Sequence, residues 1–234
     1  MMMPDGNMAA EVILDTYGEY LLARLEAKKE LGALKEAFQP QQEVLRKRLD
    51  AQRAMERAVQ HALAARDDAD MALDDAVRRF ALAILSANHN NRKSPDFVKY
   101  FPKGLTAVTL APLAEELVGV GKILDLLASE PNPALKAFAS AISQAATALM
   151  AGMDGYAGAD AAAVNAANAT RAQGLLWRDA YRKIYGELLT LYPGDKPFVE
   201  SFFKKGAKPK KGAGSGGTAP TGNDSIPKPP TSKA

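Results

Sequence analysis

The chain has 234 residues, a formal net charge of +3 and no cysteine. Without cysteine it can form no disulfide, thiolate metal site or cysteine nucleophile, which suits a reducing compartment. The first residues lack the basic flank and apolar run of a secretory signal, and no run of about 18 apolar residues indicates a transmembrane helix. We therefore expect a cytoplasmic protein.

The positive charge is concentrated at the C-terminus. Residues 204–234 contain seven lysines and one aspartate, so the residues before them carry a net negative charge. From Gly206 onward the chain consists mainly of Gly, Pro, Lys and Ser and has little to bury, which predicts disorder. The sequence therefore predicts a helical bundle domain over 1–205 and a disordered tail over 206–234.

A helical repeat of apolar residues begins near Asn7 and continues to Phe38. Pro40 then interrupts the pattern, because proline lacks a backbone donor and clashes with the preceding turn. Either Pro40 opens a second helix that forms an antiparallel hairpin with the first, or a single helix kinks and continues. The apolar stripe keeps its phase from Phe38 to Leu45, as a kinked helix requires. We favour the hairpin, because a single helix to Ala87 would leave much apolar surface exposed.

The central element of the chain is residues 41–87, a long run without Gly or Pro that keeps an unbroken helical period. At ~1.5 Å per residue, this helix is roughly 65–70 Å long. Two adjacent stripes make an apolar face that more than one partner helix can cover. One stripe carries mostly large apolar residues, among them Leu45, Leu49, Val59, Leu63, Leu73, Val77, Phe80 and Ile84. The other carries mostly alanine, including Ala51, Ala58, Ala62, Ala65, Ala69, Ala72 and Ala76.

Residues 88–109 form the longest connection before the C-terminal segment. Asn88 is a candidate left-handed cap for the preceding helix, and Ser94-Pro95 is typical of an N-cap followed by the first residue of a short helix. Aromatic residues and a lysine follow on this segment. They either cap the end of the bundle or form a docking surface for a partner or a membrane. The candidate docking residues are Phe97, Tyr100, Phe101 and Lys103.

Three further helices are predicted after the connection. One starts near Pro112 with an apolar stripe, and another starts at Asn132-Pro133. Three glycines between 152 and 158 predict a break or bend, because each costs about 1 kcal/mol in a helix interior. The last long helix ends at Tyr192, and Asp195 is a candidate cap for a final short helix. The apolar stripe of the helix that starts near Pro112 is Leu110, Leu113, Leu117, Val120, Leu124 and Leu127.

The two alanine-rich stretches, 51–76 and 159–174, are expected to face each other, because small side chains let helix axes approach closely. Alternatively, the alanines reflect only their high helix propensity. The direction of the last long helix stays open, since it depends on how 88–109 crosses the bundle. With no strand pattern present, the sequence predicts an all-α fold: an elongated, antiparallel, coiled-coil-like helical bundle of about five main helices, with a disordered C-terminal tail.

The sequence contains few of the residues that form catalytic or metal sites. Neither His61 nor His89 lies three residues after a glutamate, as di-iron bundles require. The acidic run between Asp67 and Asp75 has the wrong spacing for an EF-hand loop and instead forms i,i+4 pairs with arginines. Phosphate-binding loops and nucleophile elbows are absent from the sequence. We therefore expect no enzymatic activity, no cofactor and no metal.

The leading functional hypothesis is a non-enzymatic structural or protein-interaction bundle that self-associates and carries a flexible basic tail. Its partner would be another protein or a second copy of the chain. The alternative is a polyanion-associated protein, whose tail contacts the phosphates of nucleic acid weakly and without sequence specificity. The lysines that would make these contacts are Lys204, Lys205, Lys208, Lys210 and Lys211.

Overall fold

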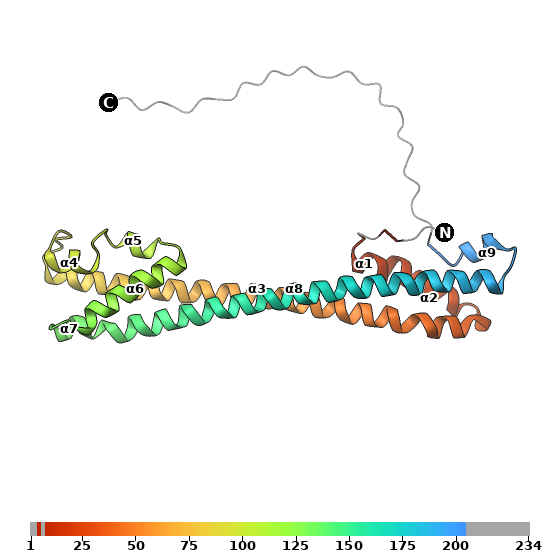
Figure 1. The fold of residues 1–234 in the computed structure, drawn as a ribbon, viewed down its shortest axis with the longest axis horizontal. Helices are drawn as coiled ribbons and strands as arrows, with labels where there is room; N and C mark the ends of the chain where they lie inside the picture. Colours follow the sequence, from red (N-terminus) through yellow and green to blue (C-terminus); the bar gives the residue numbers. More distant parts are fainter. Residues whose placement is uncertain (1–3, 6–7, 205–234) are drawn as a thin grey trace, which may run out of the picture. The chain divides into compact units, whose positions relative to one another are not determined.

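The computed structural model describes residues 4–5 and 8–204, and every regular element in this part of the chain is helical. The all-α prediction is therefore confirmed. Two long helices, α3 (Gly32–Ala87) and α8 (Phe138–Leu191), run side by side, and shorter helices pack against both ends of the pair (Figure 1). The predicted tail at 206–234 lies outside the described residues.

The N-terminal helix reverses direction earlier than predicted. It comprises α1 (Ala10–Val12), a π-helical turn η1 (Ile13–Gly18) and α2 (Glu19–Glu26). A 3-10 turn, η2 (Lys29–Leu31), then leads into α3.

The favoured hairpin at Pro40 is wrong, because α3 passes through this proline without ending. The apolar stripe explains why: Phe38 and Leu45, on either side of Pro40, are both fully buried, so the helix keeps one face in the core. That burial offsets the backbone hydrogen bond that proline cannot make. The antiparallel hairpin does form, but its turn lies at residues 27–31.

Helices α3 and α8 are antiparallel. The hydroxyl of Thr170 donates to the carbonyl oxygen of Arg48 (3.1 Å), and near the other end Gly152 lies against the backbone of Arg66. This register settles the direction of the last long helix. It also places only residues 51–59 opposite 159–167, so the predicted pairing of the alanine-rich stretches is right only in part.

The predicted break in the glycine-rich segment does not occur, and the fourth and fifth predicted helices are one continuous helix, α8. A Cβ atom added at Gly152 would lie 3.0 Å from the Cα of Arg66. Glycine at this position therefore allows the two helix backbones to approach closely. Its cost in helix propensity is offset by this contact.

The connection contains α4 (Pro95–Tyr100), α5 (Thr106–Thr109), α6 (Leu113–Ala128) and α7 (Pro133–Lys136), and α9 (Lys196–Glu200) follows α8. The predicted caps are confirmed: the side chains of Ser94, Asn132 and Asp195 each accept a hydrogen bond from the first turn of the helix that follows. The predicted left-handed cap at Asn88 is wrong by one or two residues. His89 and Asn90 have the positive φ angles, 53° and 59°.

The buried side chains form two separate cores. The N-terminal core joins the N-terminal helix to the start of α3, the end of α8 and the segment of α9. The distal core joins the end of α3 to α4, α6 and the start of α8. The N-terminal core contains Ile13, Leu14, Tyr17, Leu21, Leu25, Leu31, Leu34, Phe38, Leu45, Trp177, Tyr181, Ile184, Leu188, Val199, Phe202 and Phe203. The distal core contains Leu73, Val77, Phe80, Ala81, Ile84, Leu85, Phe97, Tyr100, Phe101, Val120, Ile123, Leu127, Ile142, Ala146 and Leu149.

Between the two cores lies a segment that we call the stalk, residues 46–72 of α3 with residues 150–169 of α8. No side chain of the stalk is buried. The two helices meet along a single seam. At the end next to the N-terminal core, Glu11 of α1 pairs with Arg53 (2.7 Å), and at the other end Glu116 of α6 faces Asp70. Between these ends, no third helix of the described part of the chain packs on the seam (Figure 1).

Candidate functional site

The aromatic residues predicted as a docking surface lie in the distal core. Phe97, Tyr100 and Phe101 are each no more than 4% exposed, and Phe80 of α3 contacts the rings of Tyr100 and Phe101. These three rings therefore close the end of the bundle, the first of the two roles that the sequence allowed. Of the four candidate docking residues, only Lys103 is exposed.

The buried Tyr100 is anchored to the turn after α6. Its hydroxyl group donates to Oε2 of Glu130, and Nζ of Lys99 lies 2.7 Å from the same oxygen. The hydrogen bonds from Lys99, Tyr100 and the backbone of Asn132 lower the pKa of Glu130 to about 2. This carboxylate therefore stays ionised and holds α4 against the end of α6.

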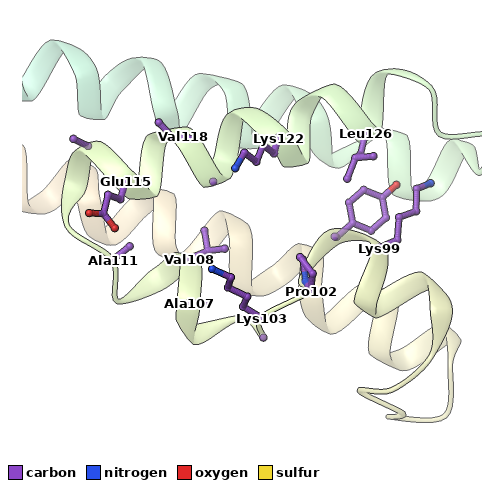
Figure 2. A pocket seen from close by; sticks show the side chains of 14 residues that line it. Lys99, Pro102, Lys103, Ala107, Val108, Ala111, Glu115, Val118, Lys122 and Leu126 are labelled. Carbon is purple, nitrogen blue, oxygen red and sulfur yellow. The ribbon is translucent and has the colours of Figure 1, made fainter.

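A trough of about 660 Å³ runs along the outside of α6 (Figure 2). One wall is a face of α6 that includes Val118, Lys122 and Leu126. The opposite wall is the segment from α4 through α5, with Lys103 and Val108. Most of the lining residues are small or apolar, and Val118 is 60% exposed.

Two lysines on the trough have no ionic partner among the described residues. Lys103 and Lys122 stand on opposite walls (Figure 2), and neither makes a hydrogen bond or an ion pair within the described part of the chain. Lys99 also lines the trough, but its charge is balanced by Glu130. At the other end of the trough Glu115 is exposed. An apolar floor between two free ammonium groups is suited to a ligand with an apolar face and flanking acids.

A second polar group lies beneath α6. Glu116 is 2% exposed, and its carboxyl group faces Asp70 and Asp74 of α3. Burial and the two neighbouring carboxylates raise the pKa of Glu116 to about 8. Burial also raises the pKa of Asp74, against the opposing effect of Arg78, whose guanidinium lies 2.6 Å from it. Glu116 therefore holds a proton at neutral pH.

Val120 and Leu127 of the predicted stripe are buried, but the stripe has Leu117 and Leu124 where the structure buries Glu116 and Ile123, and so Glu116 was missed. The buried positions are Glu116, Val120, Ile123 and Leu127, whereas Leu110 of the predicted stripe is 76% exposed. The available signal was its position four residues before Val120, in phase with Val120 and Leu127.

The N-terminal core contains a different buried polar group, Gln42, which is 3% exposed. Its amide nitrogen donates to the carbonyl oxygen of Leu14 (3.0 Å) and to Glu19, and its amide oxygen accepts from Nε1 of Trp177 (2.8 Å). Gly18 makes room for this amide, because a Cβ there would lie 2.0 Å from its oxygen. Sequence reasoning missed Gln42 as well, although it lies between Phe38 and Leu45 in the apolar stripe.

Of the five lysines predicted to bind polyanions, only Lys204 is among the described residues. Its ammonium group lies 5.5 Å from the centre of the Tyr20 ring. Lys205, Lys208, Lys210 and Lys211 lie outside the described residues, so the predicted polyanion arm stays a prediction.

The stalk shows its own pattern of charge. On α8, the only charged residues between 150 and 169 are Asp154 and Asp160, and both are exposed. Neither makes an ion pair or a hydrogen bond within the described residues. The rest of the exposed face of α8 consists mainly of alanine and glycine, with Met150 and Val164 more than half exposed.

No protein family, curated protein or solved structure that we compared matches this chain. Within the described residues, no group of three or more His, Asp or Glu side chains is arranged to hold a metal ion. Nor does any helix in this range combine the length and apolar character needed to cross a membrane.

Proposed function

We propose that this protein is a non-enzymatic structural protein that self-associates through the α8 face of its stalk. The observation that supports the proposal is the absence of any buried side chain along this stretch of paired helices. Most of the stability of a helix in a protein comes from packing of its apolar face. A two-helix seam buries little, so the stalk gains from a further helical partner.

The two helices of the stalk differ in how suitable they are as an interface. The exposed face of α3 carries charges of both signs, including Lys47, Arg57 and Asp68. The exposed face of α8 has only two charged residues, both aspartates, among mostly small and apolar ones. Depletion of charge is typical of the centre of an interface, and small side chains allow a second helix to approach closely. The α8 face is therefore the surface that we assign to self-association.

The test is the molar mass of the protein in solution by sedimentation equilibrium, with variants of the stalk. We expect a concentration-dependent oligomer for the wild-type chain. Ala157→Glu combined with Val164→Glu places two charges on the α8 face and should shift the protein to the monomer. The matched control, Gln60→Glu with Ala64→Glu, adds the same charge to exposed positions of α3 and should leave the oligomer intact. A wild-type protein that stays monomeric over the micromolar range overturns the proposal.

The lysine-rich C-terminus supports a second candidate, a polyanion-associated protein. Five lysines fall between 204 and 211, whereas the preceding residues carry a net negative charge. Binding to generic duplex DNA should weaken with salt, with a slope of roughly −3 to −5 in log affinity against log salt for five contacts. Deletion of 204–234 should abolish this binding. A slope near zero, or binding that survives the deletion, would contradict this second candidate.

A further inference from the structure

The trough on α6 has no occupant among the described residues, although its walls and floor have the features of a helix-binding groove. The α6 residues that line it, from Ala114 to Leu126, lie on one face of the helix over about 18 Å. Opposite them, the short helix α5 and the residues on either side of it supply the second wall. Two helix faces with small side chains between them leave space for a third helix.

The charge of the trough limits what that third helix can be. Lys103 and Lys122 project from opposite walls (Figure 2) and have no ionic partner within the described residues. A helix seated between them should therefore have an apolar or small-residue stripe facing the floor and an acidic residue on each side of that stripe.

The α8 face of the stalk has this arrangement. An exposed stripe of small and apolar residues runs along the helix, with one aspartate on each side. At about 100° per residue, Asp154 and Asp160 lie roughly 60° to either side of this stripe. Both aspartates are exposed and lack an ionic partner within the described part of the chain. The residues of the stripe are Met150, Ala157, Ala161 and Val164.

We propose that the lysine-rimmed trough of one copy binds the α8 face of the stalk of a second copy, with Lys103 and Lys122 paired to Asp154 and Asp160. This inference rests on the proposed self-association and names the surface that receives the stalk. The acidic run on α3 is less suitable as the occupant, because three of its aspartates are already paired with neighbouring arginines of the same helix. These aspartates are Asp67, Asp74 and Asp75.

The two lysine–aspartate pairs and the apolar contacts contribute differently to the association. Exposed ion pairs contribute little affinity and are screened by salt. The apolar residues of the two walls, such as Val118 and Val108, therefore supply most of the affinity. The charges select the register and exclude a basic or neutral helix.

The experiment is a charge exchange between the two surfaces, measured by sedimentation equilibrium of the full chain. Lys103→Glu with Lys122→Glu should weaken self-association by about tenfold or more, because two attractive pairs become repulsive. Asp154→Lys with Asp160→Lys should have the same effect. Mixing the two double variants should restore association to near the wild-type level, because each trough then meets a stalk of opposite charge.

A matched control separates the trough from general charge. Lys93→Glu with Lys136→Glu makes the same change at exposed positions that do not line the trough, and it should leave association unchanged. All the substituted side chains are exposed, so the circular dichroism spectrum and the melting temperature of each variant should stay close to the wild-type values. If a reversal variant melts early, Lys103→Gln with Lys122→Gln replaces it, with a smaller expected weakening.

The outcomes distinguish this inference from the proposal on which it rests. Restoration in the mixture supports the inference. If the trough variant associates as tightly as the wild type, or if mixing restores nothing, the inference is overturned. Self-association through the stalk then stands, with another surface as its receptor. A wild-type chain that is monomeric overturns both.

Discussion

The two cores of this protein bury a polar side chain in different ways. In the N-terminal core, the amide of Gln42 makes hydrogen bonds with Leu14, Glu19 and Trp177. In the distal core, the carboxyl groups of Glu116 and Asp74 interact with each other, and one oxygen of each is buried with no other hydrogen-bond partner among the described residues. An amide has a fixed number of donors and acceptors, whereas a carboxyl group gains or loses a donor with pH.

This difference predicts how the stability of each end of the bundle depends on pH. The Gln42 network joins η1, α3 and α8 through an amide that does not titrate, so its strength should not change near neutral pH. The attachment of α6 to α3 depends on the proton held by Glu116. We therefore expect the distal core to be sensitive to pH and the N-terminal core to be insensitive.

The largest effect is expected from substitutions in the two cores, which test whether the cores unfold independently of each other. Phe80→Ala in the distal core and Phe38→Ala in the N-terminal core each remove a fully buried ring and should cost about 3–5 kcal/mol. The stalk between them buries no side chain. Hydrogen exchange should therefore rise mainly at the end that carries the substitution. Equal loss of protection at both ends in either variant would show that the cores unfold as one unit.

The second prediction concerns the proton held by Glu116. Its pKa is about 8 in the folded protein, above its ordinary value of 4.5, so between these values the folded state binds more protons than the unfolded state. Stability should therefore fall as pH rises from about 5 through 8 and then level off. Glu116→Gln keeps a donor without a charge, so it should raise stability at pH 8 by on the order of 2–3 kcal/mol. It should also flatten this dependence.

The measurement for this prediction is denaturant unfolding of the wild type and of Glu116→Gln at several pH values. Glu115→Gln serves as the control, because Glu115 is the exposed neighbour on the same helix. A wild-type stability that rises between pH 5 and 8, or an equal response of the two variants, would contradict the assignment of the proton to Glu116.

The fold class and most helix ends could be predicted from the sequence, because they depend on local chemistry. The caps at Ser94, Asn132 and Asp195 are short-range hydrogen bonds that a few residues determine. The errors arose where a contact distant in sequence decides the outcome. Pro40 stays in a helix because the apolar residues on either side of it are buried by other elements, and Gly152 stays in one because α3 passes beside it.

The trough itself could not be predicted from the sequence, for the same reason. Lys103 was among the candidate residues, but Lys122 lies on another helix and joins it only through the packing of α6 against the α4–α5 segment. Lys103 was singled out because aromatic residues precede it on the same segment. Their rings proved to be part of the core, because Phe80 and the residues of α6 cover them.

A third prediction concerns the amide network of the N-terminal core. Gln42→Leu keeps the approximate volume of the side chain but leaves the indole N–H of Trp177 and the carbonyl oxygen of Leu14 without this partner. Each buried polar group left unpaired costs about 1–3 kcal/mol of stability. Part of this loss is offset, because the substitution also removes the buried polar amide. We expect a net loss of about 1–3 kcal/mol that is the same at pH 6 and pH 8. A strongly pH-dependent loss would contradict the contrast between the two cores.

The smallest effects are expected in the stalk, where two glycines of α8 make a matched pair. Through helix propensity alone, changing either glycine to alanine should raise the free energy of unfolding by about 1 kcal/mol. At Gly155 nothing lies within 4 Å of the added Cβ, so Gly155→Ala should stabilise the protein by about that amount. At Gly152 the added Cβ meets the Cα of Arg66 at 3.0 Å, and backbone cannot move aside as a flexible side chain can. Forcing the helices apart costs about 1–3 kcal/mol, so Gly152→Ala should be neutral to destabilising. Thermal melts that show equal gains for both variants would mean that the stalk helices are not held at this close approach.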